Sequence, residues 1–125
     1  MATMTKEQII DTIKGQLETA KQELYMQKGS FTDMLKTDPV YAMEWGGRGM
    51  MQAGCKVKVL ARSIEIAKTC SVDRFGSFLI QNVLRYSRPT SSCPISNLKD
   101  AMMAEEWARL ASQFDKMFDP TLDDK

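Results

Sequence analysis

The amino-acid sequence predicts an all-α protein: a single-domain antiparallel bundle of four to five helices, with a kink or break at a glycine cluster. Two observations favour this fold class. Apolar residues recur at alternating spacings of three and four along most of the chain, which is the period of an amphipathic helix. No segment alternates apolar and polar residues with period two, so we expect no strand. The 125 residues suit one domain, spanning 1–125, around one core.

The first helix is expected to begin after Thr5, because Thr5 and Gln8 have the spacing of a capping box. In that motif each of the two side chains satisfies a free backbone N–H group at the helix start. Its apolar stripe comprises Ile10, Ile13, Leu17, Ala20 and Leu24. Gly29 is expected to end this helix, and Ser30 to begin a short separate turn.

A further helix is expected to start at Asp38, with Pro39 in the first helical position, and to continue to about Thr69. It contains the glycine cluster of residues 46–49. Several glycines in one turn cost about 1 kcal/mol each relative to alanine, so we expect the chain to kink or break there. In the alternative, four small residues allow another helix to approach closely; they are Ala42, Gly46, Gly49 and Ala53.

The next helix is expected to begin within residues 71–74. Its apolar stripe comprises Val72, Phe75, Phe78, Leu79, Val83 and Tyr86. Residues 87–94 contain two prolines and four hydroxyl side chains, which is typical of a loop. This loop should separate the fourth helix from the last one.

The last helix is expected to start near Ser96 or Asn97 and to stop before Asp119. Its stripe comprises Met103, Trp107, Leu110, Phe114 and Met117. Residues 1–4 and 119–125 should be frayed. The first and last helices have the cleanest stripes, so an alternative to a core role is a seam between copies of a homo-oligomer.

Residue types that are missing or isolated argue against catalysis. The chain has no histidine, the commonest general base and zinc ligand. Its three cysteines, Cys55, Cys70 and Cys93, match neither a disulfide framework nor a zinc motif, and we expect reduced thiols in the cytoplasm. No catalytic pair appears, since Glu105 and Glu106 are adjacent and point to different sides of a helix. We therefore expect no enzyme activity, no metal and no cofactor.

Hydropathy and methionine content bear on binding. No segment approaches the roughly 18 apolar residues of a membrane span, so no membrane association is expected. Methionine is frequent, with 10 residues. Flexible Met side chains fill irregular core spaces and also line adaptable binding surfaces. We expect most of them in the core, with a Met-lined interface as the alternative.

Charge is unevenly distributed along the chain. Residues 1–44 contain five Lys and seven acidic residues, for a net charge of −2. Residues 45–90 contain eight basic and two acidic residues, for +6, and residues 91–125 contain four and seven, for −3. A basic middle therefore lies between acidic ends, although the whole chain carries only +1.

Helical spacing places the basic residues of the middle on two faces. Lys58 and Arg62 are four apart, whereas Arg74, Arg85 and Arg88 follow one side of the next helix. Exposed Lys and Arg side chains in such an arrangement bind a phosphate backbone irrespective of base sequence. Two further residues lie at the margins of this predicted site: Arg48 and Tyr86. In the alternative, these cations form solvated helix faces, and some of them pair with the acidic terminal helices packed alongside.

The sequence thus predicts a non-catalytic accessory subunit that binds a nucleic-acid backbone, DNA or RNA, within a larger nucleoprotein complex. In size and architecture the chain is similar to the small subunits of CRISPR effector complexes, which is an analogy of architecture and not a shared motif. The alternative function is a small protein-binding adaptor or inhibitor that acts on a partner protein and forms a homo-oligomer.

Overall fold

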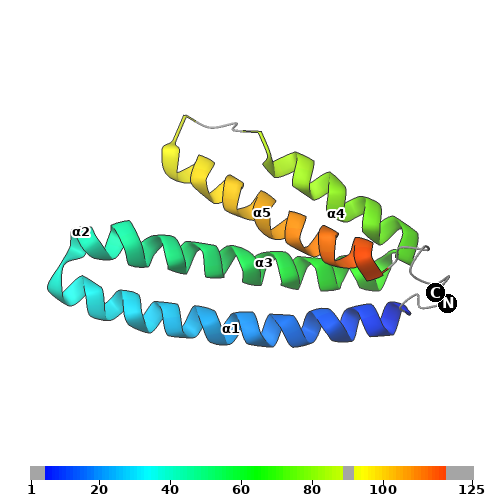
Figure 1. Ribbon diagram of the computed structural model, residues 1–125, viewed down its shortest axis with the longest axis horizontal. Coiled ribbons are helices and arrows are strands. Elements are labelled where there is room, and N and C mark those ends of the chain that lie inside the picture. Colours follow the sequence, from blue (N-terminus) through cyan, green and yellow to red (C-terminus); the bar gives the residue numbers. More distant parts are fainter. Residues whose placement is uncertain (1–4, 89–91, 118–125) are drawn as a thin grey trace.

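The computed structural model describes residues 5–88 and 92–117, with side chains to residue 114, and these ranges are helical without any strand (Figure 1). The prediction of an all-α fold is confirmed. Four helices are long, and a three-residue helix and a π-helical segment precede one of them. In chain order the elements are α1 (Lys6–Thr37), α2 (Pro39–Tyr41), η1 (Ala42–Gly46), α3 (Gly47–Thr69), α4 (Val72–Tyr86) and α5 (Pro94–Met117). The predicted fraying at 1–4 and 119–125 lies outside the described residues.

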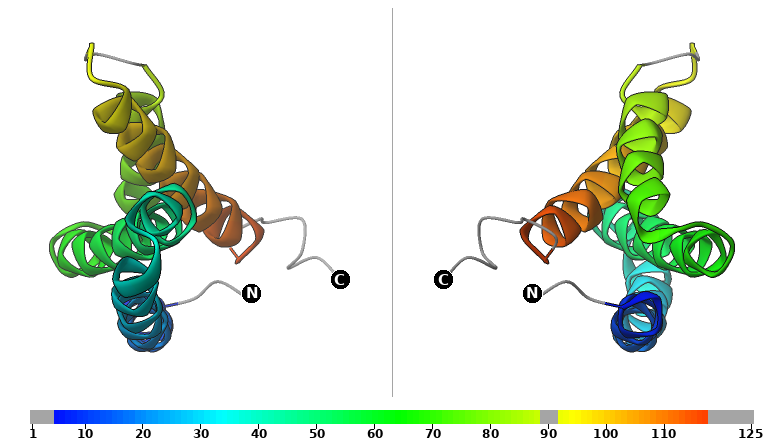
Figure 2. Two further views of the ribbon diagram at one scale, coloured as in Figure 1. Left: turned by 90° about the vertical axis from the view of Figure 1, so that its left-hand side faces the viewer. Right: turned by 90° about the vertical axis from the view of Figure 1, so that its right-hand side faces the viewer.

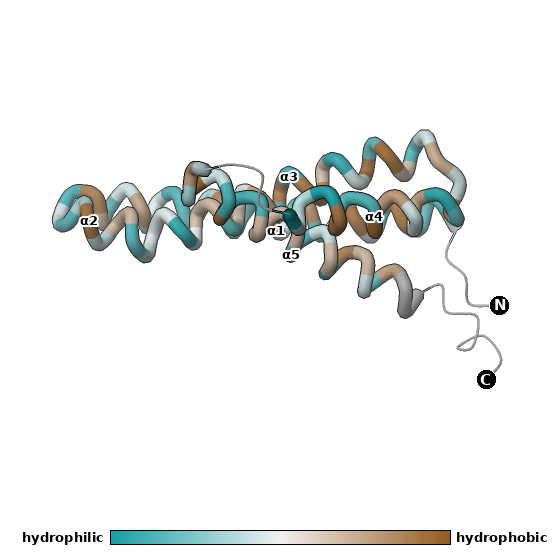
Figure 3. Tube along the Cα trace, turned by 90° about the horizontal axis from the view of Figure 1, so that it is seen from above, coloured by the Kyte–Doolittle hydropathy of each residue, from teal (hydrophilic) through white to brown (hydrophobic). Residues whose placement is uncertain are grey.

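The helices form two hairpins. α1 packs antiparallel along η1 and α3, and α4 packs against α5. The second hairpin is joined to the first mainly by contacts of α5 with α3, whereas α4 contacts α3 little. Figure 1 shows α3 between α1 and α5, with the α2 end of the first hairpin protruding beyond the second. Brown and teal residues alternate along the helices in Figure 3, as amphipathic helices require.

The capping box at the start of α1 is confirmed. Gln8 N–H donates to Thr5 Oγ1 at 3.1 Å, and Thr5 N–H donates to Gln8 Oε1 at 2.8 Å. The expected stop at Gly29 is wrong, because α1 continues through it to Thr37. The last turns of α1 pack against η1, which offsets the cost of a helical glycine.

The glycine cluster does not break the chain. Gly46 and Gly47 have helical dihedral angles (φ −71°, ψ −38° and φ −63°, ψ −40°), and the helix passes directly from η1 into α3. The alternative of close helix approach is what the structure shows. A Cβ atom on Gly46 would lie 3.2 Å from Met34 Sδ and 3.3 Å from Phe31 Cδ2, both on α1. Because the helix is continuous, the expected break is wrong, whereas a kink at the cluster stays a prediction; the π-helical turn η1 ends at the first glycine of the cluster.

Two other predicted helix starts are confirmed, and a third is displaced by two residues. Asp38 caps α2 by accepting from Tyr41 N–H at 3.1 Å, and Ser71 caps α4 by accepting from Arg74 N–H at 3.4 Å. α5 begins at Pro94, two residues before the expected Ser96. Proline suits a first helical position because its missing N–H would have no partner there.

The core lies where α1, α3, α4 and α5 meet. Its largest fully buried side chains include Trp107, Phe75 and Phe114, and the two phenylalanine rings meet edge to face with centroids 5.5 Å apart. Leu110 is also buried, and Leu17 packs against the same core. The alternative of an outward seam formed by the stripes of the first and last helices is therefore wrong.

Candidate nucleic-acid interface

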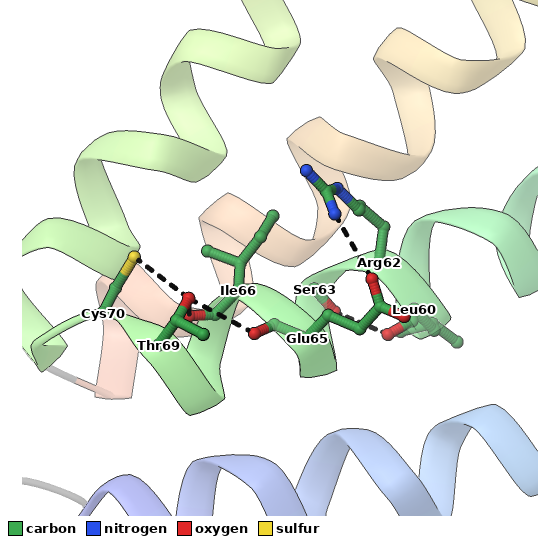
Figure 4. Close-up of polar contacts among 7 residues, drawn as sticks. All are labelled: Leu60, Arg62, Ser63, Glu65, Ile66, Thr69 and Cys70. Carbon is green, nitrogen blue, oxygen red and sulfur yellow. Dashed lines mark hydrogen bonds and ion pairs between the residues drawn. The ribbon is translucent and has the colours of Figure 1, made fainter.

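One side of α3 presents the predicted basic residues of that helix. Arg48, Lys58 and Arg62 are exposed. Positions 48, 51, 55, 58 and 62 follow one another at alternating spacings of three and four, so the three cations lie along one side of the helix. Arg62 Nη1 lies 3.2 Å from Glu65 Oε2 on the same helix, as Figure 4 shows. Both of these side chains are largely exposed, so the pair contributes little stability and leaves Arg62 accessible to a ligand.

α4 presents a second basic stripe. Arg74 and Arg85 are exposed, eleven residues apart on one side of the helix, and the exposed Arg88 follows two residues after the end of α4. The Arg85 guanidinium carbon lies 6.0 Å from the centroid of the Tyr86 ring, at the outer limit of a cation–π contact. The Tyr86 ring is half-buried against the core. The expectation of an exposed stacking ring at Tyr86 is therefore wrong, because the helix turns that ring inward.

Lys99 is an exposed cation on α5, close to α3. The Cys55 thiol on α3 reaches the Lys99 carbonyl oxygen, with an Sγ···O distance of 4.0 Å. Burial raises the pKa of the Cys55 thiol, and the positive charges of Lys58 and Lys99 oppose that effect. Asp100, through a hydrogen bond and its charge, and to a smaller degree Tyr86 raise the pKa of Lys99. The side chain of Lys99 is thus paired with Asp100, and its backbone contacts α3.

The opposite end of α4 also adjoins α3. A hollow of about 360 Å³ lies there, lined by Cys70, Arg74, Ser77, Phe78 and Gln81. Cys70 is the residue that caps the C-terminus of α3. Arg74 is thus the predicted site residue of α4 that lies beside the end of α3. The other predicted cations are distributed along α3 and around the C-terminal end of α4.

Arg48 lies at the edge of this surface. It precedes Cys55 by seven residues, or about 10 Å along a helix axis, and is the second residue of α3. Sequence reasoning missed Lys99, because that residue belongs to the acidic third of the chain and is followed by Asp100, whose Oδ1 lies 3.0 Å from its Nζ. No local pattern marks it as part of a basic surface.

In the described part of the chain, none of these cations pairs with a carboxylate of the terminal helices, and their exposure is equally the state that solvated helix faces would have. There, five of the six predicted cations have no carboxylate within 4.0 Å; they are Arg48, Lys58, Arg74, Arg85 and Arg88. The ion pair that does join α3 to α1 uses a different residue, with Lys56 Nζ 3.7 Å from Glu23 Oε2.

A groove lies between α1, α3 and α5. Its volume is about 540 Å³, and Lys56, Leu110 and Glu106 are among its lining residues. Glu106 is buried and accepts a hydrogen bond from Gln52, whereas the neighbouring Glu105 is exposed. Arg109 pairs with both glutamates, and its Nη1 lies 3.7 Å from Glu106 Oε2. Among the residues described, no group of three His, Cys, Asp or Glu side chains could hold a metal ion.

Comparisons with known proteins give no relative: no protein-family model matches the chain, and neither the curated proteins nor the solved structures contain a significant match. In the part of the chain that the structure describes, no helix combines the length and the apolar character needed to cross a membrane.

Proposed function

We propose that this protein is a non-catalytic accessory subunit that binds a nucleic-acid backbone without sequence specificity, inside a larger nucleoprotein complex. The observation that supports the proposal is a set of exposed cations on α3, on α4 and just after it, and on α5. We refer to these residues as the basic surface: Lys58, Arg62, Arg74, Arg85, Arg88 and Lys99. Arg62 and Lys99 pair with neighbouring carboxylates of their own helices, and the other four have no carboxylate within 4.0 Å in the described part of the chain.

Cations without protein partners favour a polyanion for a simple energetic reason. Each one that contacts a phosphate releases a condensed counterion, and no internal ion pair has to be broken first. Arginine side chains also match phosphate geometry with two parallel hydrogen bonds. Arg74 and Arg85 are eleven residues apart, or about 16 Å along α4, a distance over which a duplex presents about ten charges.

The proposed specificity is for the backbone and not for bases. The Tyr86 ring is half-buried, so stacking of bases on it is restricted. Phosphate contacts position a protein on nucleic acid but carry no sequence information. We therefore expect binding to homopolymeric and mixed sequences with similar affinity.

Fluorescence anisotropy of the full chain with labelled single-stranded RNA, single-stranded DNA and duplex DNA tests the proposal. If the protein neutralises about four phosphates of duplex DNA, a plot of the logarithm of the association constant against the logarithm of the salt concentration should have a slope of about −3.6. Reversing Arg85 and Arg88 to Glu should make that slope shallower by about two or more units, because two cation–phosphate contacts disappear.

The matched control reverses Lys14 and Lys28 to Glu. Both are exposed on α1, and the change in net charge is identical. The control should retain a steep salt slope. If the two double variants lose affinity equally, only net charge matters and the basic surface is not the binding site. Absence of binding at low salt would refute the proposal as a whole.

A second candidate function is a small adaptor or inhibitor that acts on a partner protein. One observation favours it: large apolar side chains are exposed where the first hairpin protrudes, and exposed apolar patches mark interaction surfaces. On this function, basic residues would steer association and reversal of Arg85 and Arg88 would change the association rate.

A further inference from the structure

The hollow at the start of α4 lies on the side of this helix that carries Arg74 and Arg85. Its volume is about 360 Å³, and five residues line it: Cys70, Arg74, Ser77, Phe78 and Gln81. The last four belong to α4 and follow one another at spacings of three, one and three, so they lie on one side of the helix. Arg85 is four residues beyond Gln81 and continues the same side. The hollow is therefore in line with the cations of α4.

The described helices leave this side of α4 open. α4 packs against α5 and, less extensively, against α3. Figure 2 shows the molecule from both ends, with α4 on the side of α3 that faces away from α1. The side chains of Arg74, Ser77 and Gln81 are all exposed. A ligand can therefore reach the hollow without displacing any part of the described fold.

The lining of the hollow combines three kinds of chemical group. Arg74 is a cation with no carboxylate within 4.0 Å among the described residues. Phe78 is partly buried against the core and also lines the hollow. The side chains of Ser77 and Gln81 make no hydrogen bond in the described part of the chain. The hollow thus offers a positive charge, an aromatic ring and unused hydrogen-bonding groups within about two turns of one helix.

This combination of groups matches a nucleotide. Arginine binds phosphate with two parallel hydrogen bonds. An aromatic ring stacks on any base, because every base has a flat face. Serine hydroxyl and glutamine amide groups both donate and accept hydrogen bonds, so they suit the polar edge of a base. Each group of the lining therefore has a counterpart in one nucleotide.

The shape of the site favours an unpaired base over a duplex. A volume of about 360 Å³ is within the usual range of small-molecule sites, roughly 300–1,000 Å³. A base inside a duplex reaches such a hollow only after it has left its stack and its pairing partner, which costs free energy. The bases of a single strand are already free to turn outward. Single-stranded nucleic acid therefore fits the hollow better than duplex.

Phe78 is better placed for stacking than Tyr86, although both side chains are partly buried. The difference is that Phe78 borders a hollow in which a base can lie against the ring. Sequence reasoning assigned Phe78 to the apolar stripe of the helix, and its contact with the core agrees with that assignment. Only the hollow beside it adds a second role.

We propose that the hollow is a subsite for one unpaired base of a single-stranded nucleic acid, RNA or DNA. Phe78 stacks on the base, and Arg74 binds the adjoining phosphate. Ser77 and Gln81 hydrogen-bond to the edge of the base. Stacking accepts every base, so the subsite adds a preference for single strands and none for a sequence. The inference rests on the proposed function, because it assigns a base to the same basic surface.

Fluorescence anisotropy of the full chain with an oligothymidine strand and with an abasic strand of the same length tests the subsite. Both strands carry the same phosphates, so the cations contribute equally to the two affinities. The intact strand should bind about five- to tenfold more tightly, because only that strand has bases to stack. Oligouridine RNA, measured beside them, identifies the preferred sugar.

Two pairs of variants locate the subsite. Phe78→Leu removes the ring and should reduce the preference for the intact strand to less than twofold, whereas Tyr86→Leu on the same helix should preserve it. Ser77→Leu fills the hollow from an exposed position and should act like Phe78→Leu, whereas Ser30→Leu, exposed on α1, should have no effect. Far-UV circular dichroism checks that each variant is folded, and Ser77→Leu carries the test if Phe78→Leu unfolds.

Cys70 provides a measurement that needs no variant. This residue lines the hollow, and its Sγ lies 3.9 Å from Thr69 Oγ1 at the end of α3 (Figure 4). At saturating concentration, the intact strand should slow the alkylation of Cys70 by iodoacetamide at least fivefold, as mass spectrometry of the peptides measures. The abasic strand should not slow it, because it leaves the hollow empty.

The outcomes separate this subsite from the proposed function. Equal affinity for the intact and the abasic strand would overturn the inference, and a steep salt dependence of both affinities would leave the proposed function standing. Equal protection of Cys70 by the two strands would likewise overturn the inference. Absence of binding to any nucleic acid at low salt would refute the proposed function together with the subsite.

Discussion

Alanine at Gly54 should stabilise the protein. Gly54 lies inside α3, where a Cβ atom would meet nothing within 4 Å. Replacing a helical glycine by alanine removes conformational freedom from the unfolded chain and adds about 1 kcal/mol to the free energy of unfolding. For a domain of this size, the melting temperature should rise by about 4 °C.

Alanine at Gly46 should not stabilise the protein, although the backbone contribution is the same. The added Cβ would lie 3.2 Å from Met34 Sδ and 3.3 Å from Phe31 Cδ2. Overpacking of this kind costs about 1–3 kcal/mol, so the net change should lie between zero and a loss of about 2 kcal/mol. The difference between the two variants isolates the packing of η1 against α1, because the backbone contributions cancel.

Urea denaturation followed by far-UV circular dichroism measures both free energies, provided that the m-value is unchanged between variants. Gly76→Ala is a second control, since Gly76 lies inside α4 with nothing within 4 Å of its Cβ position. It should stabilise as much as Gly54→Ala. If Gly46→Ala is equally stabilising, α1 does not pack against η1 in the manner described.

Three further predictions concern the thiols and the core. Burial raises the pKa of Cys55 above its ordinary 9.0, so the folded state keeps a proton that the unfolded state loses. Stability should therefore fall above about pH 9 more in the wild type than in Cys55→Ala, as urea titrations at several pH values would show. Backbone hydrogen bonds from Ser96 and Ile95 lower the pKa of Cys93; iodoacetamide should label it before Cys55, and mass spectrometry showing the reverse order would contradict this. Phe114→Ala removes a buried ring and its edge contact with Phe75, and denaturation should show a loss of about 3–5 kcal/mol; a loss below 1 kcal/mol would mean that the ring is not buried.

Several features of the fold follow from sequence alone because short-range interactions determine them. The capping residues Thr5, Asp38 and Ser71 each hydrogen-bond to a backbone group three residues away. The apolar stripe of the last helix is also confirmed from Met103 to Phe114, because a period of 3.6 residues leaves one side to be buried. The cations of the candidate site could likewise be selected from their spacing on two helices.

Only the tertiary structure decided the rest, because the competing energies involve residues distant in sequence. Gly29 and Gly46 are helix-breaking by local propensity, and contacts between α1 and η1 outweigh that cost. Whether Arg85 is paired depends on which carboxylates the fold brings near it. Lys99 belongs to another helix than the predicted cations, and only the folded chain brings its carbonyl oxygen to Cys55 of α3. The exposure of Trp45 arises in the same way, since it depends on how far the α4–α5 hairpin extends along α3 and on nothing in the local sequence.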